Sequence, residues 1–181
     1  TLCPTGANAQ NRIFGRQAWG GLSGNWGTAV GGRVATFSSG TGSFDMFGNI
    51  DPFGTGFNTA SLGSTFTPSS TFRFDNSILY QSPVWGGFRF GAGYSFNVST
   101  AEVGGSGNNL KAWFTGVSFA LGPFYAAATY DVLTVPDNGV TGSATTPALL
   151  ANTDDSKYLQ IGATFDLKFV KFAAAYAKED D

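Results

Sequence analysis

The sequence has 181 residues, a formal charge of −2, 26 glycines and 18 phenylalanines, and only 12% charged residues. Soluble domains carry about 25% charged residues and about 7% glycine. Because the chain has no histidine and one cysteine, histidine-dependent catalysis, histidine-ligated metals and a disulfide framework are excluded. We therefore expect no enzyme activity and no cofactor. The acidic balance, without a cluster of lysine and arginine, also argues against a nucleic-acid partner.

In chain order, residues 1–12 have neither the basic start nor the apolar core of a signal peptide, and we expect no strand there. After them, alternation of apolar and polar residues with a period of two predicts β-strands. We expect strands at about 14–22, 26–34, 72–81, 85–98, 109–121, 124–133, 157–167 and 169–178.

The clearest alternation covers residues 85–98. One face of this strand is predicted to hold Phe88, Phe90, Ala92, Tyr94, Phe96 and Val98, and the other face is polar and rich in glycine. In residues 72–81 the pattern places Phe74 on the same face as Ile78 and Tyr80, with Asn76 and Leu79 as interruptions. Each strand therefore has one apolar and one more polar face.

The connections alternate strictly between short and long. Short ones are expected near 23–25, 82–84, 122–123 and 167–168, and long ones at 35–71, about 99–108 and 134–156. Tight turns at one end of a sheet and long loops at the other are typical of outer-membrane barrels. Residues 112–130 are long and uncharged enough for a membrane helix, but Gly122 and Pro123 in their middle favour two strands and a turn.

These patterns predict an all-β fold, a transmembrane antiparallel β-barrel whose outer face meets lipid and whose inner face is wet. Two alternatives stay open: a small closed barrel of eight strands that acts as an anchor or adhesin without an open pore, and a soluble β-sandwich. Aromatic residues near strand ends are candidates for the interfacial girdles of a barrel. They are Trp26, Trp85, Phe88, Phe96, Trp113, Phe124, Tyr130 and Tyr176.

The connection 35–71 is long and rich in apolar side chains. It contains Phe37, Phe44, Met46, Phe47, Ile50, Phe53 and Phe57. Because a loop in water does not normally carry so many aromatic residues, we expect it to fold into the barrel and constrict the pore. Its acids Asp45 and Asp51 then lie opposite the basic residues Arg16, Arg33 and Arg73, and such fixed charges select ions. Arg89 is expected to face the lumen as well, which favours a weak preference for anions.

Three segments carry a family resemblance. They are GRQAWGGLSGNWGTAVGGRVA (15–35), IDPFGTG (50–56) and RFDNSILYQSPVWGGFRFGAGYSF (73–96). Together they resemble the trimeric general porins of Gram-negative outer membranes, of the betaproteobacterial type. In that family a loop folds into the pore with a proline–aromatic–glycine segment beside an acid, which Asp51-Pro52-Phe53-Gly54 matches. Arg16, Arg33 and Arg73 occupy the family's basic positions, and Asp45 is a weaker match.

The resemblance implies a place in the outer membrane, a homotrimer, contact with outer-membrane lipid and lipopolysaccharide, and diffusion of small hydrophilic solutes and ions. Porins of this type have about sixteen strands, so the chain, 1–181, resembles about half of a single barrel domain. Acidic residues at the loop end, in 154–155 and 179–181, are of a kind that Ca²⁺ binds; solvated charges are the more ordinary interpretation.

Overall fold

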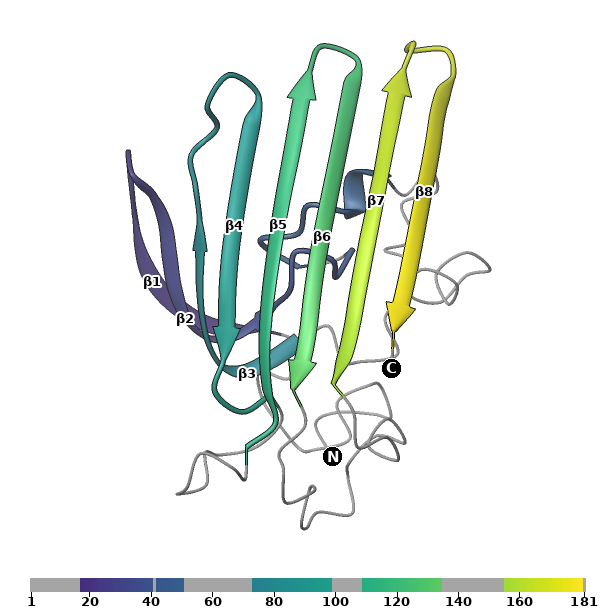
Figure 1. Ribbon diagram of the computed structural model, residues 1–181. Helices are drawn as coiled ribbons and strands as arrows, with labels where there is room; N and C mark the ends of the chain where they lie inside the picture. The colour runs from purple at the N-terminus through teal and green to yellow at the C-terminus, as the bar shows by residue number, and fades with distance from the viewer. Residues whose placement is uncertain (1–16, 41, 51–72, 99–108, 135–154, 181) are drawn as a thin grey trace, which may run out of the picture.

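The computed structural model describes residues 17–40, 42–50, 73–98, 109–134 and 155–180, which form one sheet and part of one loop (Figure 1). The strands are β1 (Ala18–Gly24), β2 (Gly27–Ala35), β3 (Arg73–Gln81), β4 (Phe88–Ser95), β5 (Lys111–Leu121), β6 (Phe124–Thr134), β7 (Ser156–Asp166) and β8 (Lys171–Asp180). A 3-10 turn, η1 (Gly48–Ile50), lies in the loop between β2 and β3. Among the described residues, no helix has the length and apolar character needed to cross a membrane.

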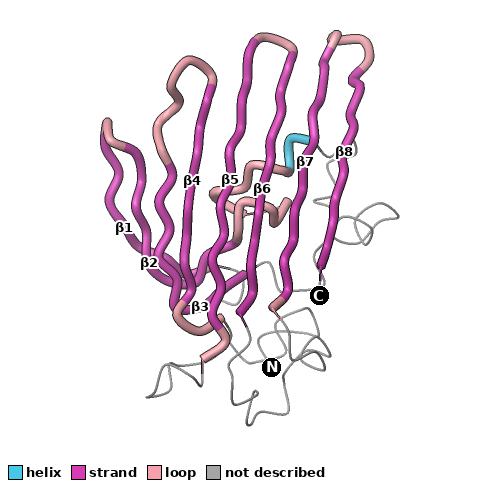
Figure 2. Tube along the Cα trace, in the orientation of Figure 1, coloured by secondary structure: helices cyan, strands magenta, loops and turns pink. Residues whose placement is uncertain are grey.

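Each strand pairs antiparallel with the next, in the order β1 to β8. All the short connections lie at one end of the sheet, and the strands leave for their long connections at the other end (Figure 2). The predicted all-β meander is therefore confirmed. Within the described part of the chain β1 pairs only with β2 and β8 only with β7, so the sheet does not close. An eight-stranded closed barrel is not favoured by this topology.

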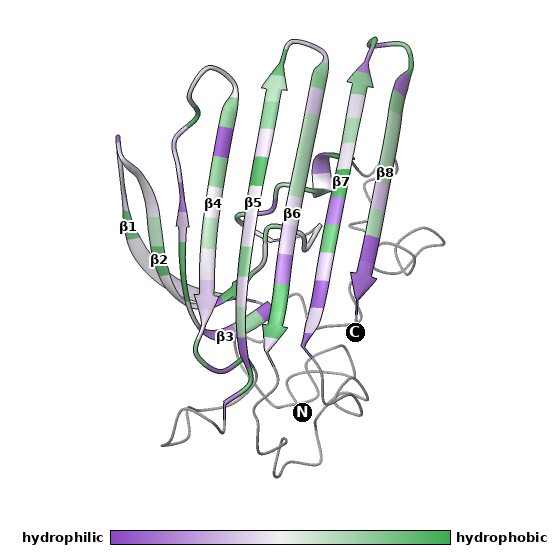
Figure 3. Cartoon of the chain, viewed as in Figure 1, coloured by the Kyte–Doolittle hydropathy of each residue, from purple (hydrophilic) through white to green (hydrophobic). Residues whose placement is uncertain are grey.

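The two faces of the sheet differ as the alternation predicts. On the convex face Phe88, Tyr176 and Leu22 are 55%, 57% and 74% exposed. The cross-strand register keeps the faces apart, because Phe90 opposes Val117 on one side and Gly91 opposes Gly116 on the other. Apolar residues alternate with polar ones along most of the strands (Figure 3). Such a face needs an apolar environment rather than water.

Most of the predicted girdle residues lie exposed near strand ends or in the short turns. They are Trp26, Trp85, Phe88, Phe96, Trp113 and Phe124, with Tyr176 exposed further along β8 and Tyr130 half-buried. Several of them form ring contacts, for example Trp85 with Phe90 at 5.5 Å between centroids. The geometry is that of a sheet with a covered concave face and an apolar convex one.

Two details of the sequence interpretation were wrong. The strand predicted at 85–98 is β4, which runs only from Phe88 to Ser95, because Gly86 and Gly87 have positive φ and form a turn. Val98 was placed on the exposed face with Phe88, but it lies beyond the end of β4 and is 3% exposed. The backbone bends after Ser95, so alternation no longer fixes the face.

Phe74 was also placed on the wrong face. It was expected beside Ile78, but Phe74 is 2% exposed and packs on Phe114, whereas Ile78 is 55% exposed. The reason is local: Asn76 adopts a left-handed conformation with φ 48, and the register with β2 shifts between Gly32 and Val34. Such an irregularity changes which side of the strand successive side chains occupy.

Candidate pore-lining loop and wall

Residues 36–50 lie on the concave face of the sheet, behind β5 to β7 in the view of Figure 1. Phe37, Met46, Phe47 and Ile50 are at most 2% exposed. Their burial removes apolar surface from water, which is favourable by about 25 cal/mol per Å². This free energy stabilises the loop against the concave face. Residues 36–40 and 42–50 pack on the concave face of the sheet, the side on which an inward-folded loop must lie. Residues 51–71 lie outside the described part, and constriction of a pore stays a prediction.

Three glycines on the concave face of the sheet, which we call the wall, leave room for the loop. A Cβ atom on Gly91 would overlap the Phe37 ring, and one on Gly116 would lie 2.8 Å from the Cβ of Phe37. On β7, a Cβ on Gly162 would lie 2.8 Å from Ile50. The inner face that the sequence predicts to be rich in glycine therefore leaves room for the apolar side chains of the loop.

Four hydrogen bonds from side chains also fasten the loop to the wall. Gln81 on β3 donates to the carbonyl oxygen of Phe44 at 3.2 Å, and the Tyr125 hydroxyl on β6 donates to that of Met46. The ammonium of Lys171 on β8 donates to the carbonyl oxygen of Asn49 at 2.9 Å. In the opposite direction, the Ser38 hydroxyl donates to the buried carboxylate of Asp131 on β6. The loop is thus attached to both halves of the sheet.

Asp45 organises the loop itself. Its carboxylate accepts backbone N–H groups of Gly40 at 2.7 Å, Gly48 at 2.5 Å and Phe47 at 3.3 Å. Burial raises the pKa of Asp45 to about 6, although these N–H donors act in the opposite direction. At neutral pH the carboxylate is mainly ionised. Asp45 therefore combines a negative charge on the loop with a structural role that the sequence did not predict.

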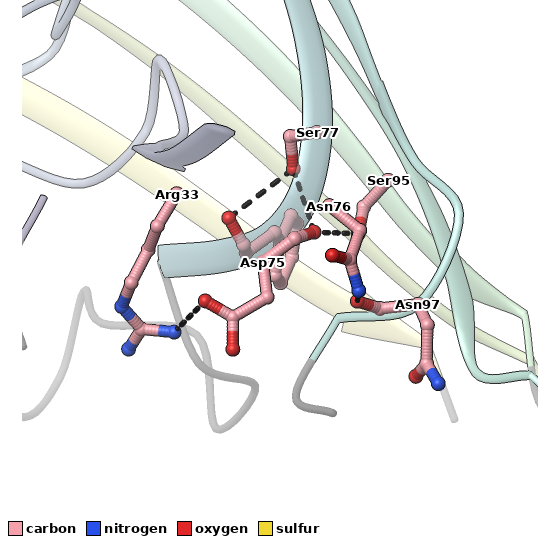
Figure 4. A network of polar contacts seen from close by, with 7 residues as sticks. Arg33, Asp75, Asn76, Ser77, Ser95 and Asn97 are labelled. Atoms are coloured by element: carbon pink, nitrogen blue, oxygen red, sulfur yellow. Dashed lines mark hydrogen bonds and ion pairs between the residues drawn. The ribbon is translucent and has the colours of Figure 1, made fainter. Parts of the chain in front are cut away.

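Arg33 forms an ion pair at the base of the loop, with its Nη1 atom 2.6 Å from the Asp75 carboxylate (Figure 4). Neighbouring serines hold the backbone there, because Ser77 and Ser95 both donate hydroxyl hydrogen bonds to the carbonyl oxygen of Asp75. The network includes the left-handed Asn76, whose side-chain amide donates to the carbonyl oxygen of Asn97 at 3.1 Å. The positive charge of Arg33 is therefore balanced by the carboxylate of Asp75.

The remaining predicted site residues divide into two groups. Arg73 begins β3 opposite Ala35 and is half-buried. Arg89 lies on β4, exposed, on the same face as Gly91 and therefore on the side of the sheet that holds the loop. Asp45 and Arg89 both interact electrostatically with the Tyr125 hydroxyl. Arg16 and Asp51 lie outside the described residues, and the roles of all six stay predictions.

Three wall residues were missed by the sequence interpretation. Lys171 and Asp131 were read only as members of alternating strands, and Asp75 was read as an ordinary inner residue. No local signal distinguishes Lys171 or Asp75, and all three residues acquire their roles from partners at least 42 positions away. Only the position of Asp131 in an otherwise uncharged strand pattern marks it as unusual.

The described residues give no support to a Ca²⁺ site at the loop-end acids in 154–155 and 179–181. Asp180 accepts a hydrogen bond from Lys178 at 2.7 Å, and the described residues contain no group of three acidic or sulfur ligands suited to a metal. Asp154 and Asp181 lie outside the described part. The concave face and the loop carry fixed charges, hydroxyl groups and backbone dipoles, and such groups can select ions and polar solutes.

Comparison with known proteins agrees with this geometry. A family model described as Gram-negative porin matches residues 4–181. An outer membrane porin protein of Bordetella pertussis is 36% identical over 97% of this chain and 45% of its own length. Among solved structures, an anion-selective porin from Comamonas acidovorans has the same fold, with a TM-score of 0.59 and 22% identity over 91% of this chain and 46% of that one. The chain spans about half the length of these relatives, and it belongs to the Gram-negative porin family of the outer membrane.

Proposed function

We propose that this chain forms part of the wall and the constricting loop of an outer-membrane diffusion porin. One observation carries the proposal: the apolar side chains of residues 36–40 and 42–50 are buried on the concave face of a sheet whose convex face is apolar and exposed. A loop fixed in that position narrows the space that the sheet encloses. Small hydrophilic solutes and ions then pass between the loop and the opposite wall, without any chemical step.

We propose a weak preference for anions as well. The predicted constriction sets the basic residues Arg16, Arg33 and Arg73 against the loop acids Asp45 and Asp51, and Arg89 adds a positive charge on the concave face. Low-dielectric walls focus such charges and raise the local concentration of counter-ions. The anion-selective porin of Comamonas acidovorans, which has the same fold, makes this direction of selectivity the natural one to test.

The test is planar-bilayer recording of the protein purified in detergent from outer membranes. The proposal expects stepwise conductance increments and, in a KCl gradient, a reversal potential shifted toward the chloride equilibrium potential. A reversal potential close to the potassium equilibrium potential contradicts the anion preference. If the correctly folded protein gives no conductance at all, the diffusion function itself is rejected, and an anchoring role becomes the better explanation.

A homotrimer in contact with outer-membrane lipid and lipopolysaccharide is the proposed assembly. Small residues on the convex side of β1 and β2 permit close approach of another subunit, since a Cβ on Gly20 would meet no atom within 4 Å. The exposed apolar residues of the other strands suit lipid. Chemical cross-linking of intact outer membranes is expected to give a band of three subunits; a monomer band alone contradicts the proposal.

A further inference from the structure

The positive charges of the described wall are not equivalent. Arg33 is paired with Asp75 at 2.6 Å, and an ion pair acts at a distance as a dipole, whose field falls off faster than that of a single charge. Arg89 and Lys171 differ from it, because neither forms an ion pair with an acid in the part of the chain that the structure describes. No carboxylate in that part lies within ion-pair distance of either cation, although Asp166 is the cross-strand neighbour of Lys171.

Arg89 and Lys171 lie on the same side of the sheet as the loop. Arg89 shares its face with Gly91, which contacts Phe37, and Lys171 shares its face with Ala175, which packs against the buried core. Both are close to the short-turn end of their strands, where β4 and β8 carry hydrophilic bands (Figure 3). Three strands, β5 to β7, lie between them, and the four strand spacings of about 4.8 Å each amount to about 19 Å across the sheet.

The edge of the loop lies between these two cations. Lys171 donates to the carbonyl oxygen of Asn49 at 2.9 Å, at η1. On the other side, Arg89 interacts with the Tyr125 hydroxyl, which is bonded to the carbonyl oxygen of Met46. An ammonium has three N–H donors, so the bond to Asn49 leaves Lys171 with donors for a passing anion. Asp166, its cross-strand neighbour, instead accepts the backbone N–H of Lys168 at 2.7 Å.

We infer that Arg89 and Lys171, on the short-turn side of the loop, determine the anion preference of the pore, and that the compensated Arg33 does not. The inference rests on the proposed diffusion function and deepens it by assigning the selectivity to particular side chains. The ligand class is small anions, such as chloride or a carboxylate, that pass from one cation to the other along the loop edge. At about 0.1 M salt the screening length is about 10 Å, so the two charges act separately there and jointly at lower salt.

The test measures reversal potentials of channels from outer membranes in chloride gradients at low salt. Arg89→Gln and Lys171→Gln should each lower the ratio of anion to cation permeability about threefold, the change expected when the local potential falls by about half a kT, because anions are depleted and cations enriched by the same factor. Lys171→Arg should retain the ratio, since it keeps the charge. Lys178→Gln, which removes an exposed lysine from the convex face, is the matched control and should leave the ratio unchanged.

The double variant Arg33→Gln with Asp75→Asn removes both members of the ion pair and keeps the net charge. Its permeability ratio should equal that of the unmodified protein. The inference is overturned if Arg89→Gln and Lys171→Gln conduct with an unchanged ratio, whatever the double variant does. If the unmodified protein forms no channel, the proposed function fails first. Heat-modifiable migration on gels establishes that each variant is folded. If the double variant is not folded, the permeability ratios of the variants Arg89→Gln and Lys171→Gln decide whether the inference holds.

Discussion

The hydroxyl of Ser38 donates a hydrogen bond to the carboxylate of Asp131, which joins the loop to a residue of β6 that lies 93 positions further along the chain. Asp131 is 6% exposed, and its second oxygen, Oδ1, has no hydrogen-bond partner in the described part. The Ser38 hydroxyl is therefore its one bonded partner there. A carboxylate buried in this way is costly unless it is bonded, so this contact is a sensitive point of the loop attachment.

Removal of that hydroxyl is predicted to destabilise the protein. Ser38→Ala leaves a buried carboxylate without its donor, which costs about 1–3 kcal/mol of unfolding free energy. Guanidinium unfolding in detergent measures the loss. Ser43→Ala, at an exposed loop serine, is the control and should change little. Asp131→Asn keeps an oxygen acceptor for Ser38 and removes the charge, so it should be no less stable than the unmodified protein; a loss like that of Ser38→Ala contradicts this reasoning.

The wall glycines give a second prediction. Gly116→Ala places a Cβ 2.8 Å from Phe37 and 2.9 Å from the Met46 sulfur, and such overpacking costs about 1–3 kcal/mol. Gly20→Ala meets no neighbour of its own chain within 4 Å, so in the dissociated single chain it should stay within about 0.5 kcal/mol of the unmodified protein. Unfolding midpoints compare the two. Equal unfolding midpoints for both variants would show that the loop does not pack closely against β5.

The left-handed residue at the base of the loop gives a third prediction. Asn76 has φ 48 and donates its side-chain amide to Asn97. Asn76→Ala loses this hydrogen bond and keeps a Cβ in the left-handed conformation, which costs about 1–2 kcal/mol when no polar side chain compensates for it. Asn76→Gly also loses the hydrogen bond, but glycine adopts the left-handed conformation without a steric cost. The glycine variant should therefore be the more stable of the two; the reverse order in thermal unfolding contradicts the assigned backbone conformation.

Asp45 gives a prediction about pH. Its pKa is about 6 in the folded protein against 3.8 for the free side chain. Between these values Asp45 holds a proton in the folded chain that it has released in the unfolded chain, so its contribution to stability falls as the pH rises from about 4 to about 6 and is level above that. The full change is at most about 3 kcal/mol, at 1.36 kcal/mol per pKa unit.

Unfolding measured across this pH range tests the effect of Asp45. The comparison is made in an Asp131→Asn background, because Asp131 is a second buried carboxylate in the described part. In that background Asp45→Asn should remove the decrease, because the titrating group is gone. Asp166→Asn, which replaces an exposed acid at a turn, is the control and should keep the decrease. A decrease that survives in Asp45→Asn assigns the pH dependence to another group.

The sequence predicted the sheet well where the strands are regular. Residues 157–167 alternate without interruption, and β7 follows that pattern, with Gln160 buried and Ile161 exposed. Prediction failed at Phe74 and Val98, because a register shift, a positive φ and a bend there are set by contacts with β2 and with residues after Asn109. A period of two assumes a continuous strand, and it carries no information once the strand is irregular.

For the site, composition predicted more than spacing did. The phenylalanines of residues 36–50 indicated a buried loop, and the structure describes one there. The partners of the charged residues could not be predicted, because the Arg33–Asp75 and Lys171–Asn49 contacts join positions 42 and 122 apart. Such contacts depend on how the strands are placed side by side and on where the loop crosses them.

The central claim, that residues 36–50 lie in the conducting path, has a direct test. In a Cys3→Ser background, Ser43→Cys introduces one thiol at an exposed loop position. A bulky, membrane-impermeant thiol reagent added during planar-bilayer recording should then reduce the single-channel conductance. Ala92→Cys, on the convex face of β4, should show no such reduction. If mass spectrometry shows that Ser43→Cys is fully labelled while its conductance is unchanged, the loop does not lie in the path, and the account is contradicted.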